Sequence, residues 1–419
     1  MVHRIGSKLR AQIGKFSGEL SRGLFKARRR LVEEMVYGIQ AGGSVLLTEV
    51  ARALDEPITI KKTEERLSNN LADGRILDVL GQEILERGAC RIDDDSLLIL
   101  DPSDICKKYA KKMEYLAEVR DGSEQTIGNG YWMCEVVGAE TGGSEVVPLA
   151  QSLWSQEAPD HVSENDEILK LVRRVYDATG RRGVFVIDRG GDRRELYKEL
   201  VPGGYRFLIR QRGDRHILYR GKKMEMMALA RICPTPYAET IVKEKNGEES
   251  CYTLEFGSVP VRLPQWPEFK LWLVVVKGFG KEPMLVLTTE PMRKSRKVLW
   301  WAVESYLTRW KVEETIRFIK QSYDLENIRV LGYDSIRNMA VLVFACFYFV
   351  AVWIGTKAKL EILATHVLKA AKRLFGVPDF RYYAISDGIK NILTRAGQGI
   401  LPRNGLDPPA HPQLMLFEA

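Results

Sequence analysis

Three carboxylates have positions in the sequence that could serve chemistry: Asp101, Asp188 and Glu313. Asp101 follows the apolar run Leu-Leu-Ile-Leu, and Asp188 follows the apolar run Val-Phe-Val-Ile. Each run is typical of a buried β-strand, and ligands of open α/β sheets bind beyond the carboxyl ends of the strands. An aspartate after a strand also often caps the next turn. Neither aspartate therefore establishes a catalytic site by itself.

The third carboxylate belongs to a group with regular spacing. Tyr306, Arg309, Glu313 and Lys320 lie in a predicted helix, where about 100° per residue places all four on a stripe about 60° wide. A solvated face would explain an ion pair of Arg309 with Glu313, but it gives no reason for the tyrosine and lysine. Glu314 points about 80° off this stripe, so the spacing selects Glu313.

These residue types fit the cleavage of a phosphodiester bond. Two divalent ions about 3.5–4 Å apart can activate water and stabilise the attacking and leaving oxygens. Mg²⁺ prefers oxygen ligands such as carboxylates. Arg309 and Lys320 would hold phosphates, and Tyr306 would hydrogen-bond one. The sequence therefore predicts a metal site among phosphate-binding side chains.

The elements that must position these residues change in character along the chain. Helical periodicity dominates the first 90 residues, and strands alternate with helices up to residue 212, which is typical of an α/β sheet. Short alternating strands follow, and a long helix is predicted over 293–323. An apolar helix over 336–355 and another near 359–375 come next. Asp104 and Asp192, which follow the two strand aspartates, are predicted to cap short helices.

Together these features resemble the bacterial cut-and-paste DDE transposases of insertion sequences, which carry a Y-R-E-K motif. The resemblance covers nearly the whole chain and includes residues 111–132, which look like the segment after the first aspartate. It implies a ribonuclease-H-like catalytic core interrupted by a β-rich insertion, with an all-helical N-terminal DNA-binding region. The expected division of the chain is a helical DNA-binding region with a basic arm (1–90), the first part of the core (91–212), the insertion (213–292), the second part of the core (293–375), and a C-terminal helix with a disordered tail (376–419).

The resemblance also implies a function. Asp101, Asp188 and Glu313 would bind two Mg²⁺ ions, for which Mn²⁺ can substitute. The enzyme would nick transposon ends and use the 3′-hydroxyl for strand transfer into target DNA, as a homodimer that holds two ends. Tyr306 and Lys320 would hold DNA near the scissile phosphate together with Arg309.

Other side chains are weaker candidates for DNA contacts. In relatives with a β-rich insertion, a flipped base stacks on an aromatic residue of the insertion, and Trp266 and Trp272 are the candidates. Core packing is the favoured explanation of both. Arg189 and Arg210 could touch phosphates, but ordinary ion pairing explains them equally well.

The basic charge lies at one end of the chain. The 419 residues have a net charge of +8, and the first thirty hold nine bases and one acid, including Arg28, Arg29 and Arg30. With four glycines that weaken an isolated helix, this segment is expected to be an arm that becomes ordered on DNA. A solvated tail and a membrane-surface helix are the alternatives.

Residues 46–71 have the pattern of a helix-turn-helix, although a self-packed helical hairpin fits equally well.

The C-terminal end resembles a short docking motif. Gln413, Leu414, Leu416 and Phe417 follow a proline-rich stretch, and they look like the segment by which bacterial proteins bind the replication sliding clamp. A disordered tail that carries a few apolar anchors suits this mode of binding. A tail that folds back onto the core is the alternative.

Composition excludes several classes of protein. The six cysteines form no C-x-x-C pair and the five histidines are scattered, so a zinc site and a disulfide framework are not expected. Residues 339–355 carry no charge, but a buried core helix is favoured over a membrane span.

We expect a cytoplasmic, nucleoid-associated bacterial protein without a membrane partner. A ribonuclease-H-like nuclease or resolvase without strand transfer, and a non-catalytic DNA-binding regulator, remain alternatives.

Overall fold

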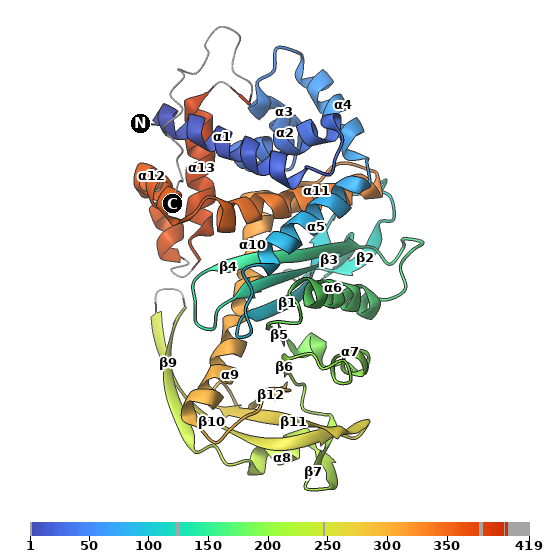
Figure 1. Cartoon of the computed structure of the whole chain (residues 1–419), viewed down its shortest axis with the longest axis vertical. Helices are drawn as coiled ribbons and strands as arrows, with labels where there is room; N and C mark the ends of the chain where they lie inside the picture. The colour runs from blue at the N-terminus through green and yellow to red at the C-terminus, as the bar shows by residue number, and fades with distance from the viewer. Residues whose placement is uncertain (1, 123–125, 246–247, 377–379, 398, 401–419) are drawn as a thin grey trace.

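The computed structural model describes residues 2–122, 126–245, 248–376, 380–397 and 399–400. N-terminal and C-terminal helices gather at one end of an elongated molecule, a mixed sheet crosses its middle, and the strands β9–β11 form the other end (Figure 1). The α-helices are α1 (Val2–Leu20), α2 (Lys26–Gly42), α3 (Leu47–Leu54), α4 (Ile60–Leu71), α5 (Arg75–Ala89), α6 (Glu164–Ala178), α7 (Arg194–Leu200), α8 (Met226–Ile232), α9 (Arg296–Thr308), α10 (Trp310–Ser322), α11 (Tyr333–Tyr348), α12 (Thr356–Gly376) and α13 (Tyr382–Ala396).

The strands form one continuous sheet. They are β1 (Leu97–Cys106), β2 (Ala117–Arg120), β3 (Ile127–Ala139), β4 (Val146–Trp154), β5 (Val184–Ile187), β6 (Phe207–Arg210), β7 (His216–Tyr219), β8 (Lys222–Glu225), β9 (Tyr237–Lys245), β10 (Glu248–Leu263), β11 (Trp266–Lys277) and β12 (Met284–Thr288). Within it, β4, β3, β1, β5 and β6 lie side by side. The pairs β4–β3 and β3–β1 are antiparallel, whereas β1–β5 and β5–β6 are parallel. This order and these directions are those of a ribonuclease-H-like core, which confirms the predicted fold class.

The crossovers between parallel strands explain the helices between them. Parallel neighbours cannot be joined by a tight turn, so α6 precedes β5 and α7 connects β5 to β6. Successive side chains of each strand point to opposite faces of the sheet and therefore pack into two separate hydrophobic cores. Leu97 and Ile99 pack on the side of α9–α11, whereas Leu98 and Leu100 pack on the side of α6 and α7.

The inserted strands extend the core sheet. β12 pairs antiparallel with β6, and the order continues through β11, β10, β7 and β8, while β9 pairs with β10. The expected β-rich segment therefore shares a hydrogen-bonded edge with the core. It also contains the short helix α8, which the strand-like pattern did not predict.

The N-terminal segment differs from the arm that the glycines suggested. Residues 2–20 form α1, whose apolar face is buried against other helices. Phe16 is 1% exposed and lies 5.5 Å from the ring of Phe349 and 5.2 Å from that of Trp353. Gly6 is useful in this packing because a Cβ there would lie 2.4 Å from the Cβ of Ala396. Helix–helix packing, without DNA, supplies the stability that an isolated Gly-rich helix lacks.

The apolar helix near residue 340 is a core helix. The stretch Tyr333–Trp353, which joins α11 to the π-helical turn η3 (Phe349–Trp353), is the described helix that is long and apolar enough to cross a membrane. Its mean hydropathy is 1.8, but 89% of its apolar window is buried inside the protein. Burial of this kind is what the interior of a folded domain requires.

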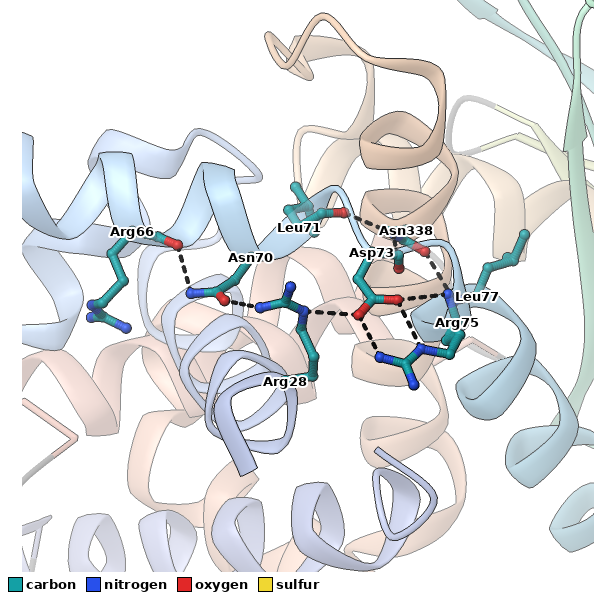
Figure 2. Close-up of polar contacts among 8 residues, drawn as sticks. All are labelled: Arg28, Arg66, Asn70, Leu71, Asp73, Arg75, Leu77 and Asn338. Carbon is teal, nitrogen blue, oxygen red and sulfur yellow. Dashed lines mark hydrogen bonds and ion pairs between the residues drawn. The ribbon is translucent and has the colours of Figure 1, made fainter. Parts of the chain in front are cut away.

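One buried amide joins the N-terminal helices to this core helix. Asn338 is fully buried on α11, donates to the carbonyl oxygens of Leu71 (2.7 Å) and Asp73 (2.9 Å), and accepts from the amide of Leu77 (2.9 Å). Figure 2 shows these bonds gathering the turn between α4 and α5 around Asn338. The turn is thereby fixed to the core, since each buried polar group has its partner.

Candidate active site

Strand register brings Asp101 and Asp188 together. The parallel pairing of β1 with β5 runs from Leu97 opposite Val184 to Leu100 opposite Ile187, and the two aspartates follow these last partners. Both side chains therefore project from the same face of the sheet, towards α9 and α10. The expectation that Asp101 ends its strand is wrong: β1 continues to Cys106, because antiparallel pairing with β3 persists beyond the parallel pairing.

The turn after β5 fixes Asp188. Its side chain accepts a hydrogen bond from the amide of Gly190 at 2.6 Å and caps the short 3₁₀ helix η1 (Arg189–Gly191). A Cβ at Gly190 would lie 2.8 Å from an oxygen of Asp188, so a glycine suits this close approach. The aspartate is thus both a cap and a neighbour of Asp101.

Arg309 connects the helix to the strands. Its guanidinium lies 3.6 Å from Asp101 and hydrogen-bonds Glu313, one turn further along. The predicted single helix over 293–323 is divided at this residue into α9 and α10, and the Arg309 amide bonds the Tyr306 carbonyl oxygen in a tighter, 3₁₀-like turn. Asp101 and Glu313 therefore share one positive charge.

The environment of Asp101 shifts the pKa of its carboxyl group. Burial and the nearby negative charges of Asp188 and Glu313 raise its pKa to about 7, although Arg309 acts in the opposite direction. The Asp101 side chain keeps 18% of its surface exposed, and that of Glu313 keeps 45%. Excess negative charge at a partly open position is the electrostatic condition that favours a bound cation.

Tyr306 and Arg210 form the wall of a cavity beside Arg309. The cavity has a volume of about 420 Å³ and is also lined by Phe279 and Trp310. The guanidinium groups of Arg210 and Arg309 lie 5.9 Å and 5.8 Å from the centre of the Tyr306 ring. Two arginines therefore face an aromatic wall next to the carboxylates, an arrangement suited to a phosphate and a base.

Lys320 lies two turns beyond Glu313 and serves a neighbouring group of acids. Its ammonium is 3.4 Å from Asp104 and 2.9 Å from Glu326. The prediction that Asp104 caps a helix is wrong, because this residue lies within β1 and also accepts from the amide of Gly122. Asp192 is the C-cap residue of η1 and not the N-cap of α7, which is Arg193, and its carboxylate binds Arg215 at 2.6 Å.

Two residues of this region were missed in the sequence. Glu135 lies on β3 directly opposite Asp101, is 1% exposed, and has one carboxylate oxygen without a hydrogen-bond partner. Its pKa is raised to about 8 by burial and by Asp101, against the influence of Lys320. A single acid inside the apolar strand Tyr-Trp-Met-Cys-Glu-Val-Val was the available signal. The other residue is Phe279, which stands between two glycines at the turn from β11 to β12.

Of the remaining predicted DNA contacts, Arg189 directly follows Asp188 in η1, whereas the others belong to other elements. Arg28 is paired with Asp73 (Figure 2), at a distance of 3.1 Å, and Arg30 binds Glu34 and Glu56. Arg29 and Arg189 are exposed. Trp266 and Trp272 are partly buried on opposite apolar cores, and Trp272 lies under the Lys270 ammonium. The proposed clamp-binding residues, Gln413, Leu414, Leu416 and Phe417, lie outside the described residues.

Helices α3 and α4 follow one another across a turn, as the sequence predicted, and they pack on α2 as well as on each other. The turn between them includes Asp55, whose φ of 50° is left-handed, and Thr59 caps α4 by accepting from the amide of Lys62. Lys61, Lys62 and Asn69 are exposed on α4. A role in reading DNA stays a prediction.

The sequence model of the transposase DDE domain family matches residues 139–349. This chain belongs to that family. As a DDE transposase it is a DNA-cleaving and joining enzyme, and the family generally uses divalent metal ions. The matched range contains Asp188 and Glu313, whereas Asp101 precedes it, so the place of Asp101 in the site depends on the strand register.

Comparison with solved structures finds a piggyBac transposase in a synaptic complex with hairpin DNA. The TM-score is 0.42 and the sequence identity is 9%, over 93% of this chain and 78% of that one. No curated protein sequence matches this chain.

The transposase carboxylates fit a divalent ion by their chemistry, but they are not gathered around one point. In the arrangement of the described residues, no three His, Cys, Asp or Glu side chains lie together as a ready metal site. The Arg309 guanidinium, which contacts both Asp101 and Glu313, supplies positive charge instead. The unpartnered oxygen of Glu135 adds one more buried acceptor close to Asp101. Oxygen donors of this kind are those that Mg²⁺ prefers.

Proposed function

We propose that this transposase is of the bacterial cut-and-paste type with a Y-R-E-K motif. It binds inverted-repeat ends of a transposon, cleaves them, and joins the 3′-hydroxyl ends to target DNA. The observation that carries this proposal is the position of Asp101 and Asp188 on adjacent parallel strands, with Glu313 connected to them through Arg309. Ligands bind at this edge of an open α/β sheet.

Asp101, Asp188 and Glu313 would hold two Mg²⁺ ions, with Mn²⁺ as a substitute. When bound, these ions would stabilise the charge that develops on the attacking and leaving oxygens. Arg309, which contacts two of these carboxylates, would also bind a DNA phosphate in the adjoining cavity, where Tyr306 and Arg210 lie.

The other parts of the molecule would deliver DNA to this site. The helix α4 would read the transposon end, and Lys320 would hold the strand near the scissile phosphate. If a base flips out during cleavage, Phe279 is better placed to stack on it than Trp266 or Trp272, because it lines the cavity beside Tyr306. Arg29 and Arg189 remain candidates for backbone contacts.

The wider setting belongs to the same proposal. A homodimer would hold two transposon ends in the bacterial cytoplasm, in association with the nucleoid.

The C-terminal residues 413–417 would bind the replication sliding clamp. Fluorescence anisotropy of a 405–419 peptide with purified clamp tests that interaction. Saturable binding that Leu416→Ala and Phe417→Ala abolish is expected, and its absence would remove the clamp from this picture.

The catalytic assignment is tested by Glu313→Gln. The substitution keeps the size of the side chain and removes its charge, so we expect cleavage of a labelled transposon-end duplex in Mg²⁺ to fall at least a hundredfold, with end binding retained. Glu268→Gln, on an exposed position of β11, is the matched control and should cut normally. Equal cutting by Glu313→Gln and wild type would refute the assignment.

The same assay separates the alternative activities. A ribonuclease-H-like nuclease or resolvase would cut the ends without joining them to a target plasmid. A DNA-binding regulator would bind ends without cutting, and alanine at all three carboxylates would leave that binding unchanged. Joined products that depend on Glu313 are expected only from a transposase.

A further inference from the structure

We propose that the surface formed by Lys108, Tyr109, Lys111, Lys112 and Arg329, called here the basic groove, binds the phosphate backbone of the transposon end between the helix-turn-helix and the active site. This inference rests on the proposed function, because it names the path of the DNA that the enzyme cuts. It concerns residues that neither the Y-R-E-K stripe nor the basic N-terminal segment includes.

The basic groove combines shape and charge. It is a hollow of about 640 Å³ between residues 106–113 and residues 326–331. Lys108, Lys111, Lys112 and Arg329 are exposed, and Tyr109 keeps 88% of its surface accessible. Glu326 is the acid among the lining residues, and its carboxylate is paired with Lys320 at 2.9 Å. A concave basic surface with an accessible aromatic ring suits a nucleic-acid backbone.

The loop that carries these lysines is held firmly. Lys107 is buried, and its ammonium donates to the carbonyl oxygens of Glu326, at 2.6 Å, and Ile328. Its own amide donates to the Asn129 carbonyl oxygen at 2.6 Å, and the Asn129 side chain returns a bond to Ala110 at 3.2 Å. Lys107 is therefore structural, and it presents the neighbouring lysines from a fixed backbone. Preorganised groups lose less conformational entropy on binding.

One end of the basic groove lies beside the active site. The loop begins directly after β1, the strand of Asp101. The amide of Cys106 lies 3.5 Å from the Glu326 carboxylate, which in turn binds Lys320. A strand that leaves the Asp101 region past Lys320 would therefore meet the lysines next.

The other end of the basic groove reaches the helix-turn-helix. A second hollow of about 800 Å³ is lined by Lys61, Glu64, Glu65 and Asn69 of α4, among others, and by residues 329–335. Arg329 and Leu331 line both hollows, so the two are contiguous. A duplex that contacts α4 and enters the catalytic site has this continuous surface available between them. That continuity favours the transposon end over target DNA as the occupant.

The test compares two double variants of the full-length protein. Lys111→Ala with Lys112→Ala removes two exposed lysines from the basic groove, and Lys222→Ala with Lys223→Ala removes two exposed lysines from β8 as the control. The probe is a labelled duplex that carries the terminal repeat and the cleavage position, selected from DNA flanking the coding region. Fluorescence anisotropy between 50 and 300 mM salt should show weaker binding by the first variant. For this variant, the slope of the logarithm of the binding constant against the logarithm of the salt concentration should be shallower than that of wild type by about 2. This is near one for each lost phosphate contact.

A shorter duplex locates the contact. If the duplex stops before the cleavage position and retains only the part bound by the helical region, the two variants should bind it equally. The proposal is overturned if the groove variant matches the control on the longer duplex, or if it weakens both duplexes to the same extent. It is also overturned if end binding is normal and only joining of pre-cleaved ends to a target plasmid fails, because the groove would then hold target DNA.

These outcomes are separable from failure of the proposed function. If wild type neither binds nor cuts transposon ends, the function itself is refuted, and the groove inference falls with it. If wild type and both variants bind and cut alike, the enzyme is a transposase whose end DNA takes another path. Circular dichroism of the variants verifies that both remain folded, as expected for substitutions of exposed side chains.

Discussion

Arg309 determines the charge balance of the site at the scale of single residues. It contacts Asp101 and Glu313, and it also faces the ring of Tyr306. A guanidinium can make such contacts at once because its donors are spread over a plane. We infer that its interactions with the carboxylates and with a DNA phosphate are alternatives.

Glu135 gives a prediction about stability in metal-free protein. Its pKa is about 8 in the folded chain, against an ordinary value of 4.5. A raised acid pKa means that the folded state binds more protons, so wild type loses stability as pH rises from about 4.5 through 8. Glu135→Gln removes this loss. We compare the free energy of unfolding of Glu135→Gln with that of wild type at each pH. The difference should change in favour of the variant by about 2–4 kcal/mol from pH 5 to pH 8.5.

Urea unfolding in EDTA at several pH values measures this effect. Glu268→Gln changes an exposed glutamate and should follow wild type throughout. Asp101 adds a pH dependence of the same sign in both proteins, because burial, Asp188 and Glu313 raise its pKa. The explanation fails if the difference between Glu135→Gln and wild type is the same at both ends of the pH range.

Among the elements, α1 shows how packing can replace intrinsic propensity. Its glycines weaken an isolated helix, yet its buried side chains contact α13, α2 and α5. Phe16 is central to this packing because its ring lies among those of Tyr348, Phe349 and Trp353. The segment is therefore a structural part of the helical region, whatever contact its basic residues make with DNA.

Phe16→Ala tests this role of α1. Removing a ring that is 1% exposed should reduce the free energy of unfolding by about 3–5 kcal/mol, because a cavity remains among the surrounding rings. Thermal or urea unfolding without DNA gives the measurement. Phe25→Ala, at a ring that is 68% exposed, is the control and should have a smaller effect. Equal stability of Phe16→Ala and wild type would support a mobile arm instead.

At the scale of the whole molecule, one sheet connects the catalytic core to the inserted strands. β6 pairs with β5 on one edge and with β12 on the other. The turn from β11 to β12 therefore carries Phe279 to the cavity beside α9 and α10. Gly278 is needed in this turn, since its φ is 106° and a Cβ would lie 2.2 Å from the carbonyl oxygen of Thr253.

Cut-and-paste joining of two ends predicts the composition of the active complex. Mass photometry of Glu313→Gln with transposon-end duplex should show a species with two protein chains and two duplexes, because cleavage is blocked while end binding remains. An unrelated duplex of equal length should not produce it. A single chain with one duplex at every concentration would contradict the proposed synaptic homodimer.

The sequence by itself determined the local features of this transposase. Helical spacing placed Tyr306, Arg309, Glu313 and Lys320 on one face, and two apolar runs indicated the strands before Asp101 and Asp188. Alternation and strand–helix order indicated an α/β sheet, and the resemblance to transposases implied its ribonuclease-H-like form. These features depend on neighbours within a few turns or within one strand, which periodicity records directly.

Only the tertiary structure decided which residues meet. Register placed Glu135 opposite Asp101 and Asp101 beside Asp188, although these positions are far apart along the chain. The break at Arg309, the partners of α1 and the contiguous hollows near Lys111 are likewise absent from any local pattern. The physical reason is that periodicity shows which side of an element is apolar, whereas its partner is selected by packing and pairing over the whole chain.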